Sequence, residues 1–144
     1  MMKTSARNQL AGTVAAIDSG AVNDVIQLDI QGGQRLTATV THESTLNLGL
    51  TPGKSAFALI KASSVILGLP DESTRLSARN QLKGQVSYVK RGAVNAEVGV
   101  QLDGGNVIVS IITNGSVDAL ALQEGVAVVA IIKASSIIVG TFDI

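Results

Sequence analysis

Hydrophobic and polar residues alternate along several short stretches of the chain. The clearest is residues 26–31, where Ile, Leu and Ile alternate with Gln, Asp and Gln. This period of two is the pattern of a half-buried β-strand. Similar alternation predicts strands over residues 9–17 and 36–41, and Gly32-Gly33 supplies a hairpin turn that needs positive φ angles. Two more apolar stretches predict strands over residues 55–60 and 65–67.

A short helix is predicted between the third and fourth strands. Ser44 can cap its first turn, three leucines follow at alternate positions, and Thr51-Pro52-Gly53 ends it. Three strands, a helix and two strands within one short unit match a five-stranded Greek-key barrel of the OB type. The expected fold class is therefore all-β.

The whole pattern occurs twice, at a constant separation of 72 residues. The segment Ser5–Leu10, which reads SARNQL, returns as Ser77–Leu82, and Lys61–Ser64, which reads KASS, returns as Lys133–Ser136. A repeat of this length indicates one small unit written twice. We predict two tandem OB-like five-stranded Greek-key barrels, each with one short helix. Residues 1–70 form the first domain, 71–76 a linker and 77–144 the second domain.

Composition favours association between such units. The chain is 46% hydrophobic but only 2% aromatic, so its apolar mass is mainly aliphatic. Units of about 70 residues bury only about 60% of the surface that their unfolded chain exposes, and they are marginally stable alone. The third strand adds to this expectation, because Arg35, Thr37 and Thr39 become Val107, Val109 and Ile111 in the second copy. A strand that is apolar on both faces is usually covered on both, here by the first barrel or another subunit.

Charge and residue types argue against several functions. Eleven basic and eleven acidic residues give zero net charge, and the three aromatic residues are not repeated, which disfavours nucleic-acid binding. There is no cysteine, one histidine, no phosphate-binding glycine loop and no nucleophile–base pair, so an enzyme is not expected. No signal peptide or membrane-spanning run is found, so we expect a cytoplasmic protein without a membrane partner.

A small set of cations is retained in both copies. Among the basic residues only Arg7/Arg79 and Lys61/Lys133 are identical, and each lies near serines. The only acid kept in both copies is Asp71/Asp143, at the end of each repeat. Arginine offers a planar fork of donors and lysine a point charge, while hydroxyls and backbone N–H groups can replace the hydration shell of a dianion.

This donor set suggests capture of a small tetrahedral oxyanion without bond making. A purely structural reading stays open, in which the cations lie at strand ends with their stems packed and the serines satisfy turns. Arg7 and Lys61 are far apart in sequence, and nothing local shows that they meet.

The repeated motifs resemble a known family. S-A-R-N-Q-L-x-G-x-V, then G-A-V-N and I-K-A-S-S-V-I-L-G, are similar to the Mop, or molbindin, domain of the TOBE family. The resemblance spans both repeats. It implies an OB-like fold, binding of molybdate or tungstate with no further cofactor, and a homo-oligomer. The resemblance implies that this oligomer is a ring, in which three chains supply six Mop units and hold the oxyanions between subunits.

The resemblance also implies the residues of the site. It places the strand that begins a domain and the loop that ends one in different subunits. Ala62 and Ala134 would contribute only their backbone N–H groups. The oxyanion-binding residues that it implies are Ser5, Arg7, Thr41, Lys61, Ala62 and Ser63 in the first copy, and Ser77, Arg79, Thr113, Lys133, Ala134 and Ser135 in the second.

A second kind of site is expected near the threefold axis, although these loops also fit ordinary turns. Its residues are Gly20, Val22, Asn23, Gly92, Val94 and Asn95. His42 faces Asn114 in the other copy and is expected to be a cap or surface residue. The expected function is intracellular molybdate storage. A ligand-free oligomeric scaffold and a single-stranded nucleic-acid module are the alternatives.

Overall fold

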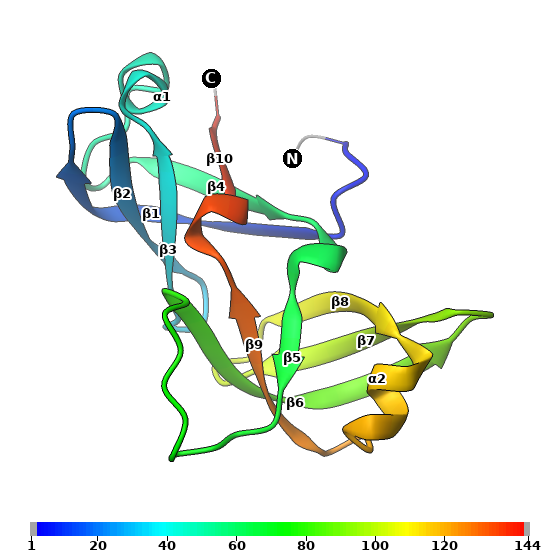
Figure 1. The fold of residues 1–144 in the computed structure, drawn as a ribbon. Helices are drawn as coiled ribbons and strands as arrows, with labels where there is room; N and C mark the ends of the chain where they lie inside the picture. Colours follow the sequence, from blue (N-terminus) through cyan, green and yellow to red (C-terminus); the bar gives the residue numbers. More distant parts are fainter. Residues whose placement is uncertain (1–2, 143–144) are drawn as a thin grey trace.

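The computed structural model describes residues 3–142 and contains two five-stranded antiparallel sheets (Figure 1). The first sheet comprises β1 (Asn8–Ser19), β2 (Asn23–Ile30), β3 (Arg35–Thr41), β4 (Ser55–Ile60) and β10 (Ile138–Thr141). The second comprises β5 (Ile66–Gly68), β6 (Asn80–Arg91), β7 (Asn95–Leu102), β8 (Val107–Thr113) and β9 (Ala127–Ile132). The outermost residues of the two predicted domains, Asp143 included, lie outside the described range.

Two short α-helices and two 3₁₀ turns complete the fold. They are α1 (His42–Asn47), α2 (Asn114–Ala119), η1 (Ala62–Ser64) and η2 (Ala134–Ser136). The all-β class, the two units and the single short helix in each are confirmed. The hairpin prediction also holds, because Gly32 and Gly33 have φ angles of 92° and 86°.

The fifth strands are exchanged between the repeats. β5 pairs with β9, with Ile66 opposite Ile131, and β10 pairs with β4, with Ile138 opposite Leu59. Each sheet is therefore completed by the last strand of the other repeat (Figure 1). The order of predicted strands placed residues 65–67 in the first barrel and did not anticipate this. A period-two pattern identifies a strand but does not specify its partner.

The helix caps differ from the prediction at one residue. Thr41, rather than Ser44, is the N-cap of α1, and its hydroxyl accepts a hydrogen bond from the Ser44 N–H at 3.1 Å. Thr113 caps α2 in the same way, accepting from Ser116 N–H at 3.0 Å. The extended backbone of the threonine places its hydroxyl over the first turn, where the N–H groups lack helical partners.

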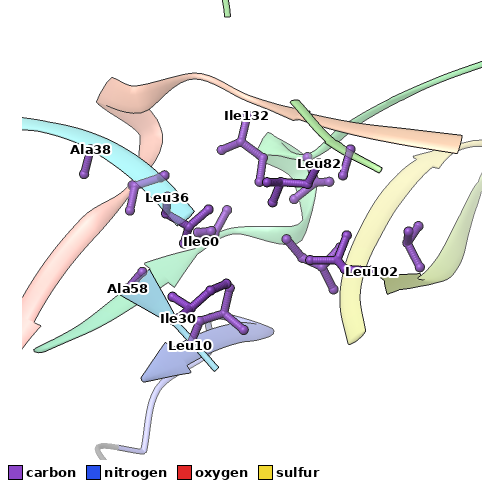
Figure 2. Packing of buried hydrophobic residues seen from close by; sticks show 14 of the residues in the cluster. Leu10, Ile30, Leu36, Ala38, Ala58, Ile60, Leu82, Leu102 and Ile132 are labelled. Atoms are coloured by element: carbon purple, nitrogen blue, oxygen red, sulfur yellow. The ribbon is translucent and has the colours of Figure 1, made fainter. Parts of the chain in front are cut away.

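One hydrophobic core runs through both repeats. In β2 the residues Ile26, Leu28 and Ile30 are buried, as their alternation predicts. Figure 2 shows residues of both repeats packed in one cluster, including Leu10 and Leu102. Burial of one continuous aliphatic core explains how two units of marginal size are stabilised together.

Two buried asparagines join the sheets through paired hydrogen bonds. The Asn8 side chain donates to the Val109 C=O at 2.8 Å and accepts from the Val109 N–H at 2.7 Å. Asn80 makes the equivalent pair with Thr37, both at 2.7 Å. These contacts bring part of β8 against the first repeat. Val109 and Ile111 are half-buried, but Val107 is 48% exposed, so the predicted cover of β8 is incomplete within one chain.

Candidate anion-binding sites

Strand pairing brings two segments of each repeat together. β1 and β4 are antiparallel neighbours, with Asn8 opposite Ile60. The residues just before β1 therefore lie beside those just after β4, which places the loop of Arg7 next to that of Lys61. β6 and β9 repeat the arrangement, with Asn80 opposite Ile132. This answers the question that the sequence left open, because the retained arginine and lysine share one end of a sheet.

Each pair of segments lines a cavity. The first has a volume of about 450 Å³ and the second about 290 Å³. The first cavity is lined by Thr4, Ser5, Ala6, Arg7, Leu59, Lys61, Ala62, Ser63, Ile111, Ser136 and Ile138. The second is lined by Thr39, Ser77, Ala78, Arg79, Lys133, Ala134 and Ser135. Ten of the twelve residues implied for oxyanion binding thus line these two cavities.

The 3₁₀ turns contribute backbone donors to the cavities. Within η1 the Ser64 N–H donates to the Lys61 C=O at 2.9 Å, and no side chain caps the turn. The first N–H groups, those of Ala62 and Ser63, are not used by the turn itself. The second turn repeats this geometry, with Ser136 N–H bonded to the Lys133 C=O at 3.0 Å. An anion in either cavity can therefore be met by main-chain donors as well as by side chains.

Two of the implied residues lie outside the cavities, and the implied place of the sites between subunits stays a prediction. Thr41 and Thr113 line neither cavity, and their hydroxyls cap α1 and α2. The resemblance also placed the two segments of a site in different subunits. In the structure the beginning and the end of one repeat line one cavity of a single chain, because β1 and β4 pair directly.

The first cavity has an acidic neighbour that sequence reasoning missed. Arg7 Nη1 donates to Glu97 Oε1 at 2.8 Å, and the Tyr88 hydroxyl donates to Glu97 Oε2 at 2.7 Å. Hydrogen bonds from Arg7 and then Tyr88 lower the pKa of Glu97 to about 2. Glu97 aligns with Val25 in the other copy, so a search for retained residues discards it. Only the packing of the second repeat against the first reveals the contact.

Arg79 has no such partner. Across residues 3–142 none of the ion pairs involves Arg79. The positions equivalent to Glu97 and Tyr88 are Val25 and Ala16, which carry no charge and no hydroxyl. The second cavity is instead lined by Thr39, where the first has Ile111. The two cavities thus share their donors and differ in the residues around them.

The two loops predicted to lie near a threefold axis are hairpin ends away from both cavities. Gly20 N–H donates to the Asn23 C=O at 3.0 Å, and Gly92 N–H to that of Asn95 at 2.7 Å. Between them Val22 and Val94 are 73% and 70% exposed. Their assignment to a second site stays a prediction.

His42 lies beside the first of these loops as the first residue of α1. Its Nδ1 lies 3.1 Å from both carboxylate oxygens of Asp24, which is fully buried and also accepts from the Gly20 N–H at 3.0 Å. Hydrogen bonds from Thr45 and from His42 lower the pKa of Asp24. Asp24 and His42 thus hold the loop in place. Within residues 3–142 no group of three or more acidic or histidine residues is suited to hold a metal ion.

The TOBE domain family matches the chain twice, over residues 4–67 and 76–139. The molybdenum transport protein ModE of Herbaspirillum seropedicae is 44% identical over 96% of this chain and 51% of its own. The molybdenum-pterin-binding protein MopA of Rhodobacter capsulatus is 43% identical over 95% of this chain and 52% of its own. The chain therefore spans about half the length of the curated relatives it matches.

A solved structure is similar over the whole chain. It is that of the cytoplasmic molybdate-binding protein ModG with molybdate bound, which is 45% identical and superimposes with a TM-score of 0.95. The match covers 98% of this chain and 100% of that one. No helix in the described part of the chain has the length and apolarity needed to cross a membrane.

Proposed function

Since the chain belongs to the TOBE domain family, of which it carries two tandem copies, we propose that it binds molybdate and tungstate non-covalently in its two cavities. The observation that carries this proposal is the meeting of a retained arginine, a retained lysine and at least two serines in each cavity. The overall likeness to ModG, a molybdate-binding protein, supports the identity of the anion. Storage or buffering of the oxyanion in the cytoplasm is the role that we propose.

The chemistry of the donors fits a small dianion. An arginine and a lysine together can neutralise two negative charges, and hydroxyl and main-chain N–H groups can donate to the remaining oxygens. Burial of an anion without such replacement of its hydration shell is costly. The charged side chains that line the cavities, arginine and lysine, offer no acceptor to the hydroxyl of monoprotonated phosphate, which is therefore disfavoured. Nothing in this arrangement activates a nucleophile, so the proposed activity is binding rather than catalysis.

We further propose that the sites are completed in a homo-oligomer, as a trimer containing six TOBE units. Exposed aliphatic side chains support association, since Ile66 and Ile138 are 56% and 63% exposed on β5 and β10, which are edge strands. The hydroxyls of Thr41 and Thr113 reach an anion in this proposal only from a neighbouring copy. Light scattering coupled to size exclusion tests the trimer, and a monomer at micromolar concentration contradicts it.

Isothermal titration calorimetry with molybdate, tungstate, sulfate and phosphate tests the binding function. We expect heat with molybdate and tungstate and much weaker binding of phosphate. The absence of heat with both metal oxyanions, or equal affinity for sulfate, overturns the proposal. Lys83→Ala serves as a control for loss of charge, because Lys83 is exposed on β6 and lines neither cavity.

A further inference from the structure

The two cavities differ in the charge available to an anion. In the second, Arg79 and Lys133 supply a formal charge of +2. In the first, the carboxylate of Glu97 is bonded to Arg7, so that Arg7, Lys61 and Glu97 together supply only +1. The charge of +2 in the second cavity matches a dianion, whereas the charge of +1 in the first does not. The retained motifs do not reveal this difference in charge, because they are identical in the two repeats.

The carboxylate is well placed to compete for the arginine. Its Oε1 takes the Arg7 Nη1–H at 2.8 Å, and its Oε2 is held by the Tyr88 hydroxyl at 2.7 Å. The Glu97 side chain is only 20% exposed, against 48% for that of Arg7. The remaining nearby cation is Lys90, which lies over the Tyr88 ring at 5.4 Å from its centroid. Glu97 is thus held by the Tyr88 hydroxyl, and Tyr88 does not line the cavity.

Resting on the function proposed above, we propose that Glu97 is an internal competitor for Arg7 and makes the first cavity the weaker of two unequal sites for a tetrahedral dianion. An anion entering the first cavity either displaces the carboxylate or shares one guanidinium with it against like-charge repulsion. The positions equivalent to Glu97 and Tyr88 are Val25 and Ala16, and within residues 3–142 Arg79 makes no ion pair. Glu97 therefore acts as a residue that sets relative affinity, and one chain fills its two sites in sequence as the anion concentration rises.

Calorimetric titration of the full chain with molybdate tests this inference. Arg79→Ala is used as the background, because it removes a central donor of the second site and leaves the first to be read. In that background we expect Glu97→Gln and Glu97→Val to raise the affinity for molybdate about three- to tenfold, the range for one charged hydrogen bond that is partly exposed. In the Arg7→Ala background the same substitutions should change affinity by less than about twofold, since the contested donor is gone.

A reciprocal substitution sharpens the test. Val25→Glu places a carboxylate at the position facing the second site and should lower the affinity of that site by a similar factor. The oligomer and the melting temperature of each variant are measured in parallel, and Glu97→Gln, which keeps the shape and one hydrogen bond, covers the case in which Glu97→Val fails to fold.

The possible outcomes separate the inference from the function on which it rests. If the wild-type protein binds molybdate and neither Glu97 variant changes the first site, the inference is wrong and the binding function stands. Weaker binding in Glu97→Gln also overturns it, because Glu97 would then orient Arg7 for the anion instead of competing for it. If no variant and no wild-type protein binds molybdate, both proposals fail.

Discussion

In the first repeat Asp24 is fully buried and bonded to His42 and Gly20, whereas the second repeat has Ala96 and Asn114 at the corresponding positions. Asn114 still holds its loop, donating from its side chain to the Gly92 C=O at 2.9 Å. By contrast, the buried asparagines that join the repeats are identical in both. A contact within a repeat is thus replaced by different chemistry in the other copy, while the asparagine contacts that join the repeats use the same residue in both.

The largest loss of stability is expected when the asparagine contacts that both repeats share are removed. Asn8→Ala removes the side-chain partner of the Val109 N–H and C=O, which are part-buried, and Asn80→Ala that of the buried Thr37 N–H and C=O, each at a cost of roughly 2–4 kcal/mol of unfolding free energy. Urea denaturation measures this cost. Gln101→Ala, which removes an exposed amide from β7, is the control and should cost little. Similar losses in both asparagine variants support their equivalence, and a loss in only one would break it.

The next largest effect is expected on the affinity of the two cavities for molybdate. Arg79→Ala should weaken the tighter class of molybdate sites more than about tenfold, because a desolvated anion loses a charged donor. Arg7→Ala should affect only the weaker class, and by a smaller factor, since Glu97 already occupies that guanidinium. Calorimetry resolves the two classes. Equal effects of the two variants would show that the surroundings of the cavities do not matter.

A third effect is confined to the first repeat and depends on pH. The pKa of Asp24 is lowered from its ordinary value of 3.8, chiefly by the Thr45 hydrogen bond. A lowered pKa means that this carboxylate stabilises the fold above about pH 3.8 and loses that contribution as pH falls further. Wild-type protein should therefore lose stability on acidification more steeply than Asp24→Asn. Denaturation midpoints at pH 7 and pH 3 measure the difference, and parallel curves would contradict it.

The smallest effect is expected at the ion pair between the repeats. The pKa of Glu97 is lowered from 4.5 to about 2, so its stabilising contribution is present at neutral pH and is lost between these two values. Because both side chains are partly exposed, the contribution is modest. Glu97→Gln should be slightly less stable than wild type at pH 7 and equal to it near pH 2, as thermal melts can show. A difference that persists at low pH would point to packing instead.

Sequence reasoning predicted the elements of each repeat because their signals are local. Alternation in residues 26–30, paired glycines at the hairpin and the return of Arg7 and Lys61 as Arg79 and Lys133 are all visible without a structure. Those signals give the class of the fold, and the family resemblance adds the ten implied site residues that line the cavities.

The features that were missed depend on partners from the other repeat. The destination of residues 66–68 is set by pairing with β9, and the role of Glu97 by contact with Arg7 some 90 residues away. The displaced cap at Thr41 is a smaller case, decided by backbone conformation rather than residue type. Comparison of the two copies even concealed Glu97, because a residue that acts on one copy only is not retained in both.

The exchange of β5 and β10 has a consequence for how the protein is made. β10 (Ile138–Thr141), which closes the sheet of the first repeat, follows all the other strands of the second repeat along the chain. During synthesis the edge of β4 therefore stays uncovered until the second repeat has been made. Neither repeat can complete its own sheet before the other has emerged from the ribosome.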